Sequence, residues 1–281
     1  MNVVAHNFGT QIIQSHLNIF VANVTPIKMR VYHIRINPLT TLKNASLIGG
    51  FRGKRHNKKG VIYIMKISKV GKLNSRSWSL EALETCPASK DSNGELVPAC
   101  KGCYAVGGNY RFQNVKDARS HNKKDWQRDE WVADMIEELD SDRYFRWFDS
   151  GDMYSLKLAE KIYEICKATP WTRHWIPTRM HKFKKFRDVI DRLNALDNVV
   201  VRLSSDGING EIIEEAQYSS TIIPFIDSLT IATVCNAPLQ DGKCKKCRAC
   251  WDKSIKVIAY AGHGAKMKKQ QRELIQAVQV V

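Results

Sequence analysis

The chain has 281 residues, 43% of them hydrophobic, so it can bury a sizeable core and is not globally disordered. Its formal net charge of +16 favours polyanionic partners, above all nucleic acid. No apolar run reaches the roughly eighteen residues of a membrane span, and the N-terminus lacks the basic-then-apolar order of a secretory signal. We therefore expect a cytoplasmic protein whose eight cysteines serve as thiolate ligands rather than as a disulfide framework.

The first part of the chain is unusually basic. Residues 1–64 contain nine Lys or Arg residues and no Asp or Glu, so they contribute +9 of the net charge. The segment that follows, from Met65, resembles the beginning of a separate domain. We expect residues 1–64 to be a basic N-terminal extension, either disordered or non-native or a nucleic-acid-binding arm. Residues 65–281 would then form the working domain.

Beyond residue 116, apolar periodicity predicts alternating helices and strands. The expected helices are Asp117–Leu139, Leu156–Thr169, Phe183–Leu196 and Lys266–Val278. The expected strands are Tyr144–Phe148, His174–Thr178, Val199–Leu203, Leu229–Val234 and Val257–Tyr260. This alternation favours an α/β fold with a parallel sheet covered by helices, and we expect a barrel-like or partial (β/α) barrel with parallel strands.

Polar residues follow three of the expected strands. Asp149 and Asp152 follow the first, Arg179 the second, and Asp206 the third. Because ligand sites of such folds lie at the carboxyl ends of the strands, these four residues are candidate catalytic residues. Each also has a structural interpretation: an aspartate beside Ser150 can cap a helix, Asp206 can belong to a turn, and the arginine can be a surface residue or a clamp for a carboxylate or phosphate.

Seven cysteines fall into two groups with metal-ligand spacing. The first group comprises Cys86, Cys100 and Cys103, and the second comprises Cys235, Cys244, Cys247 and Cys250. Two-residue gaps let neighbouring sulfurs converge on one centre. We therefore expect cysteine-rich metal-binding loops at both groups.

The choice of metal stays open at both groups. The C-x-x-C-x-x-C run of the second group is typical of [4Fe–4S] loops, with structural zinc as the alternative, and His263 could replace Cys235 in a zinc site. Three thiolates in the first group would leave one iron of a [4Fe–4S] cluster open to a ligand. The alternative there is a zinc clip completed by a distant ligand such as His121. Cys166, on the apolar face of an expected helix, is assigned to the core.

Several of these motifs together resemble the phage proteins known as gene product 88. They include Thr85-Cys86-Pro87, the C-x-x-C-Y-A element from Cys100 to Ala105, and Asp149-Ser150-Gly151-Asp152. That family in turn looks similar to proteins with radical-SAM-like barrels. The resemblance implies that the first three cysteines hold a [4Fe–4S] cluster that binds S-adenosylmethionine, with Ser150 near that cofactor. The substrate would be nucleic acid or a nucleotide, in a host cell's cytoplasm.

Two other classes of function fit the same residues. The guanine transglycosylases of tRNA and DNA combine a barrel, strand-end aspartates and a late zinc site. In that case one aspartate would attack a sugar carbon, another would act as acid or base, and the second cysteine group would hold structural zinc. A non-catalytic, metal-stabilised nucleic-acid-binding protein is the third class, with basic loops meeting phosphates.

Overall fold

A mostly parallel sheet organises the chain. The computed structural model describes residues 55–56, 62–63, 65–224 and 232–279. Its main sheet has eight strands in the order β3-β4-β5-β6-β7-β8-β10-β9. They are β3 (Ser68–Val70), β4 (Ser75–Trp78), β5 (Tyr144–Trp147), β6 (Arg173–Thr178), β7 (Val199–Ser204), β8 (Ser219–Ile223), β10 (Val257–Ala261) and β9 (Thr233–Val234). All neighbouring pairs are parallel except β3 with β4, and this confirms the α/β class.

The expected barrel is not confirmed, although part of the strand order is that of a barrel. The strands from β4 to β7 follow one another in the sheet as in a (β/α) barrel, with helices between consecutive strands. The sheet order nevertheless has two ends, β3 and β9, with no pairing between them among the described residues. The sheet is therefore open in the part of the chain that the structure describes.

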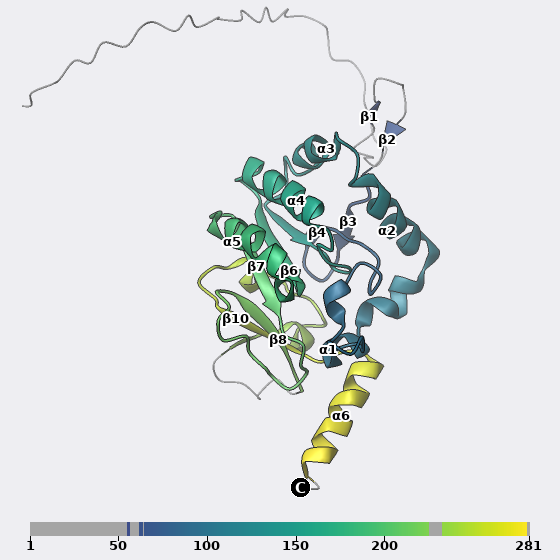
Figure 1. Ribbon diagram of the computed structural model, residues 1–281, viewed down its shortest axis with the longest axis vertical. Helices are drawn as coiled ribbons and strands as arrows, with labels where there is room; N and C mark the ends of the chain where they lie inside the picture. Colours follow the sequence, from purple (N-terminus) through teal and green to yellow (C-terminus); the bar gives the residue numbers. More distant parts are fainter. Residues whose placement is uncertain (1–54, 57–61, 64, 225–231, 280–281) are drawn as a thin grey trace, which may run out of the picture. The chain divides into compact units, whose positions relative to one another are not determined.

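Six α-helices accompany the sheet in the described residues. They are α1 (Pro98–Lys101), α2 (Gln113–Asp125), α3 (Trp131–Glu138), α4 (Leu156–Ala168), α5 (Arg187–Ala195) and α6 (Ala265–Gln279). Helices α4 and α5 connect β5 to β6 and β6 to β7, and Figure 1 shows them side by side on one face of the sheet. None of the helices in the described ranges is both long and apolar enough to cross a membrane.

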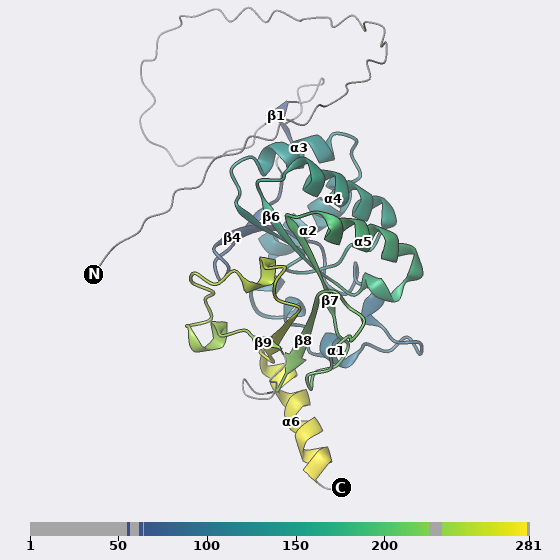
Figure 2. The ribbon, with the colours of Figure 1, turned by 90° about the vertical axis from the view of Figure 1, so that its left-hand side faces the viewer.

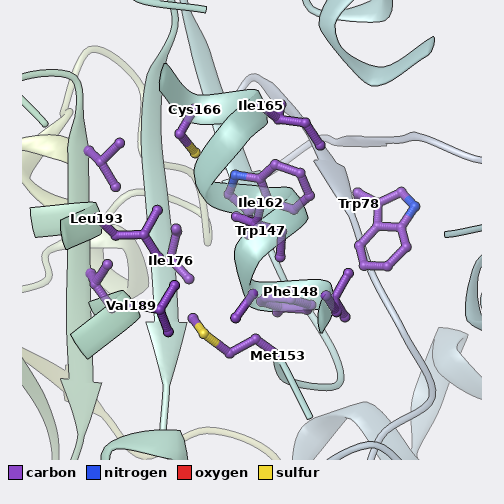
Figure 3. Close-up of a cluster of buried hydrophobic side chains, with 14 of the residues drawn as sticks. Trp78, Trp147, Phe148, Met153, Ile162, Ile165, Cys166, Ile176, Val189 and Leu193 are labelled. Atoms are coloured by element: carbon purple, nitrogen blue, oxygen red, sulfur yellow. The ribbon is translucent and has the colours of Figure 1, made fainter. Parts of the chain in front are cut away.

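The main apolar core lies between the sheet and these helices. Figure 3 shows Trp147 and Ile176 from the strands facing Ile162 and Cys166 of α4. All four side chains are fully buried. Cys166 is therefore a core residue, as expected, and stands apart from both cysteine groups.

One long helix was expected over residues 117–139, and this prediction is wrong. Helix α2 ends at Asp125 and α3 begins at Trp131. The turn between them is held by Arg128, whose guanidinium lies 2.6 Å from Asp125 and 2.8 Å from Asp134. Trp126 and Trp131 lie on either side of the break and are both buried, so apolar residues keep a helical spacing across the turn. Periodicity alone therefore could not reveal the turn.

Most predicted strands agree with the structure to within a residue, but three strands of the main sheet, β3, β4 and β8, were not predicted. Strand β4 has the mostly polar sequence Ser-Arg-Ser-Trp, and β8 is rich in hydroxyl residues, although Ser219, Ser220 and Thr221 are buried in the sheet. Of the strand expected at residues 229–234, residues 229–231 lie outside the described part of the chain. The expected extension over residues 1–64 also lies outside it, except for the antiparallel pair β1 (Arg55–His56) and β2 (Ile62–Tyr63).

Candidate functional site

The carboxyl ends of β5, β6 and β7 form one edge of the sheet, which we call the rim. Side chains and backbone from the three strand ends are joined there by hydrogen bonds. Thr178 Oγ1 donates to Asp152 Oδ1 at 2.6 Å, and Arg179 Nη2 donates to the Ser205 carbonyl at 2.7 Å. The structure therefore brings together the polar residues that the sequence placed after separate strands.

Asp152 is the most buried acid of the rim, with an exposed fraction of 6%. Its carboxylate accepts hydrogen bonds from Thr178 Oγ1, from the Arg179 backbone N–H at 2.9 Å and from the Met153 N–H at 2.8 Å. Burial raises the pKa of Asp152, although these three donors act in the opposite direction. With its oxygens occupied by the protein, Asp152 ties the end of β5 to the end of β6.

Arg179 and Asp206 form a second linked group. Arg179 Nε lies 3.3 Å from Asp206 Oδ1, and Lys182 Nζ donates to Asp206 Oδ2 at 2.7 Å. Lys182 also reaches the carbonyls of Ala88 and Lys90, each at 3.3 Å. Asp206 therefore lies between two cations, and Lys182 joins the end of β6 to the loop that follows Cys86.

Asp149 is held on the other side of the rim. Its carboxylate accepts a hydrogen bond from Ser79 Oγ and another from Tyr110 Oη at 3.3 Å, and it lies 3.5 Å from Arg119 Nη2. The neighbouring Ser150 hydroxyl donates to the Leu80 carbonyl at 2.6 Å and accepts a hydrogen bond from Arg119 Nε. Both residues thus fasten β5 to the segment that follows β4.

The backbone conformation and the close neighbours of residue 151 require the glycine of the Asp-Ser-Gly-Asp segment. Its φ is +78°, which disfavours other residues. A Cβ atom built there would lie 2.6 Å from Thr85 Oγ1 and 2.6 Å from Leu80 Cβ, a clash that has no room to relax. The glycine therefore permits the loop that carries Cys86 to lie against the end of β5.

The first cysteine group lies on the rim because its neighbours bond to the strand ends. Thr85, next to Cys86, accepts a hydrogen bond from the Asp152 N–H at 3.1 Å. Ala99, next to Cys100 on α1, donates its N–H to the Asp206 carbonyl at 2.9 Å. Figure 2 shows α1 beside the same ends of β7 and β8, with α6 below it. Cys103 follows α1, and its N–H donates to the Cys100 carbonyl at 3.1 Å.

The thiols of this group are poor thiolates without a metal. Burial, followed by the charge of Asp152, raises the pKa of Cys86 to about 12. Burial also raises the pKa values of Cys100 and Cys103, and Arg179 counteracts the shift at both thiols. At neutral pH the free thiols are protonated, so they become ligands only when a metal displaces their protons.

All four cysteines of the second group line one cavity of about 140 Å³. Its wall includes Cys235, Cys244, Cys247 and Cys250 together with apolar residues such as Trp251. The Cys235 N–H donates to the Ala259 carbonyl of β10, and the Cys244 N–H donates to the Lys72 carbonyl before β4. The second group is therefore anchored to β10 and to the turn between β3 and β4, and it packs in a cluster of buried hydrophobic residues.

Arg202 holds the loop that contains Cys250, and sequence reasoning missed it. Its side chain is fully buried, and its guanidinium donates to five backbone carbonyls at 2.9 to 3.4 Å. They belong to Ala249, Cys250, Asp252, Ile255 and Lys256. In the described ranges no Asp or Glu forms an ion pair with Arg202. A charged residue inside the apolar run Val199–Ser204 was the available signal.

Both cysteine groups offer thiols alone as donors, a set that structural zinc and iron–sulfur clusters share. Among the described residues, no three Cys, His, Asp or Glu side chains converge closely enough to bind one metal ion. A zinc site needs four sulfurs about 2.3 Å from one centre. The four thiols of the second group line a cavity of about 140 Å³.

The two histidines considered as extra ligands have other neighbours. The His263 ring stacks on Tyr104 at a centroid distance of 5.2 Å, close to the first cysteine group rather than facing the second. His121 Nε2 lies 3.9 Å from Asp125 on the same helix. A further contact that sequence reasoning missed joins Tyr260 Oη to Cys250 Sγ at 3.2 Å.

The comparisons with known proteins give one match. The profile of the family described as Gene product 88 matches residues 51–253, which is most of the chain and includes both cysteine groups. No curated protein and no solved structure matches the chain significantly.

Proposed function

The chain belongs to the gene product 88 family of phage proteins, and we propose that it is an iron–sulfur enzyme acting on nucleic acid or a nucleotide. The observation that carries this proposal is the rim itself. The loop that carries Cys86 and the helix that carries Cys100 are attached to the strand-end residues Asp152 and Asp206 by backbone hydrogen bonds of Thr85 and Ala99. Arg179 lies beside Cys100 and Cys103. Ligand sites of open α/β sheets lie at this edge.

Cys86, Cys100 and Cys103 are the residues that would hold the first cluster. A [4Fe–4S] cluster on three thiolates supplies one-electron chemistry at an iron with no protein ligand, and S-adenosylmethionine is the ligand that the family resemblance suggests for that iron. The protein's own share is to position and enclose this ligand. Arg179 adds a positive charge beside Cys100 and Cys103, and such a charge stabilises thiolates.

Cys235, Cys244, Cys247 and Cys250 would hold the second cluster. Arg202 supports this assignment because a buried guanidinium without an acidic partner is costly. Burial lowers the pKa of Arg202, and Cys250 is among the groups that act against this shift. A negatively charged metal–thiolate centre next to Arg202 would supply the missing counter-charge.

The rim aspartates fit positioning better than nucleophilic attack. Asp152 has three protein donors, Asp149 is bonded to Ser79 and Tyr110, and Asp206 lies between two cations. A transglycosylase needs an aspartate that is free to attack a sugar carbon. This requirement is why we place base exchange behind the iron–sulfur proposal.

The deciding experiment is metal and sulfide analysis, with an absorption spectrum, on the full chain purified without oxygen. We expect brown protein with about eight irons and matching sulfide, as two cubanes require. The triple variant Cys86→Ser/Cys100→Ser/Cys103→Ser and the variant Cys244→Ser/Cys247→Ser/Cys250→Ser should each keep about four irons. Cys166→Ser is the matched control, since Cys166 is buried in the core.

Two outcomes would overturn the proposal. Colourless protein that contains zinc would exclude clusters and leave base exchange or nucleic-acid binding. Full iron content in both triple variants would show that the metal is bound elsewhere. If iron is present, reductant-dependent cleavage of S-adenosylmethionine, lost in the first triple variant and kept in the second, tests the choice of ligand.

A further inference from the structure

The segment after β6 is strongly basic and carries an exposed aromatic ring. Residues 179–187, Arg-Met-His-Lys-Phe-Lys-Lys-Phe-Arg, contain five Lys or Arg residues and no acid. We call Lys182–Arg187 the basic turn. Phe183, at its centre, has 38% of its surface exposed, and Lys184, Lys185 and Arg187 are also exposed.

The basic turn has a defined backbone. Two short 3-10 helices, η4 (Met180–Lys182) and η5 (Lys184–Phe186), lead directly into α5. The Phe183 N–H donates to the Met180 carbonyl at 3.0 Å, and the Phe186 N–H donates to the Phe183 carbonyl at 2.9 Å. Phe186 is fully buried and anchors the turn in the core. The exposed Phe183 ring is therefore presented by an ordered backbone.

The position of the basic turn connects it to the first cysteine group. Lys182, its first residue, bonds to Asp206 and to the loop after Cys86. Arg179, three residues earlier, is close enough to influence Cys100 and Cys103. No ion pair or hydrogen bond of the side chains of Lys184 or Arg187 is found in the described part of the chain. Lys185 Nζ lies 5.6 Å from the Phe186 ring.

From this placement we infer that the basic turn binds single-stranded nucleic acid and leads it to the rim. Unpaired cations contact the phosphates, and Phe183 stacks on a base, the combination by which proteins hold single strands. The inference rests on the proposed function, because it names the surface that delivers the substrate. A duplex fits less well, because its bases are stacked inside and would leave the Phe183 ring without a partner.

The test measures binding of a labelled single-stranded 15-mer to the full chain by fluorescence anisotropy over a range of salt concentrations. For Lys184→Gln/Lys185→Gln we expect roughly tenfold weaker binding and a salt slope reduced by about 1.4, since each phosphate contact contributes about 0.7. For Phe183→Leu we expect a similar loss of affinity with the salt slope unchanged, because stacking releases no counterions.

The control pair Lys167→Gln/Lys256→Gln removes the same charge from the opposite edge of the sheet. Lys167 ends the last turn of α4, and Lys256 precedes β10, and both are exposed. We expect this variant to bind like the wild type. The inference would be overturned if the control pair lost as much affinity for the 15-mer as the basic-turn variant. Unchanged binding by Phe183→Leu would also overturn it. So would binding of poly-glutamate as tight as that of the 15-mer.

Binding and metal content are read separately, so the two proposals can fail separately. If the purified protein contains no iron and the basic-turn variants lose binding, this inference stands and the proposal of an iron–sulfur enzyme fails. If the protein contains iron and the basic-turn variants bind the 15-mer like the wild type, the proposal of an iron–sulfur enzyme stands and this inference fails.

Discussion

The two cysteine regions are held in the fold by different means. The first is attached to strand ends through short loops and is edged by charged side chains, among them Arg179, Asp206 and Lys182. The second is packed among buried residues such as Trp175 and Trp251, and its loop carbonyls converge on one arginine. A region edged by charged side chains suits binding of a charged ligand, whereas a region held by apolar packing and by one buried arginine suits stability or electron storage. The predictions below test this division.

The largest effect is expected from Arg202→Met, which keeps a long side chain but removes every donor. Five carbonyls would lose their partner, and we expect the free energy of unfolding to fall by about 4 kcal/mol. Urea unfolding followed by tryptophan fluorescence measures this loss. The variant should also lose the iron of the second region and keep that of the first.

The matched control is Arg76→Met. Arg76 bonds to Glu138 and Asp142 at the surface, with 31% of its side chain exposed, so its loss should cost about 1 kcal/mol or less. If Arg202→Met is no more destabilising than Arg76→Met, Arg202 does not organise the second region. Arg202→Lys, which keeps the charge but offers fewer donors, should fall between the two.

Acid should destabilise the support that both regions share. His174 on β6 is fully buried, accepts a hydrogen bond from Trp147 Nε1 at 3.2 Å and contacts Thr169 Oγ1 at 2.9 Å. Burial lowers the pKa of His174 to about 3. The unfolded chain, with a His pKa near 6.5, therefore binds the proton first as the pH falls.

The sign follows from this difference. The contribution of His174 is fully present above about pH 6.5 and is lost as the pH falls towards 3, by about 1.4 kcal/mol per pH unit at most. Denaturant unfolding at pH 7 and pH 5 should therefore differ by about 2 kcal/mol in the wild type and by less in His174→Gln. An equal pH dependence in the two proteins would contradict the prediction.

Much of this architecture follows from local sequence, and the parts that do not have physical reasons. Strands β5, β6 and β7 are apolar runs that end in polar residues, so both their existence and the rim were predictable. Strand β8 was not, because Ser219 and Thr221 are buried by the sheet and not by their own hydrophobicity. The cysteine groups follow from spacing alone. Arg202 required the three-dimensional fold, since the carbonyls that it binds lie about fifty residues away along the chain.

A smaller effect on stability and iron content is expected when the two aspartates of the first region, Asp152 and Asp149, are each replaced by Asn. In Asp152→Asn the new amide N–H would face the Arg179 backbone N–H, which would lose its acceptor. We expect a loss of about 1–3 kcal/mol and a lower iron content in the first region. In Asp149→Asn the amide oxygen can accept from one of the Ser79 and Tyr110 hydroxyls and the amide N–H can donate to the other, so the loss should be smaller. Thermal unfolding and iron analysis of both variants measure the difference, and equal losses would argue against Asp152 as the link between β5 and β6.

The smallest effect is expected from two tyrosine hydroxyls, one in each region. Tyr260→Phe removes the contact with Cys250 Sγ, and Tyr104→Phe removes a hydrogen bond of 2.7 Å to the Asp149 carbonyl. Hydrogen bonds to ligand sulfurs tune the potential and retention of a cluster, so Tyr260→Phe should speed loss of iron from the second region to a chelator and shift its reduction potential. Each change should cost only about 1 kcal/mol of stability. Because Tyr104 follows Cys103 and its hydroxyl bonds to the rim at Asp149, its loss should leave the second region's potential unchanged. If Tyr104→Phe rather than Tyr260→Phe changes the second region's reduction potential, the two regions are not separate units. The same holds if either variant shifts the reduction potentials of both regions equally.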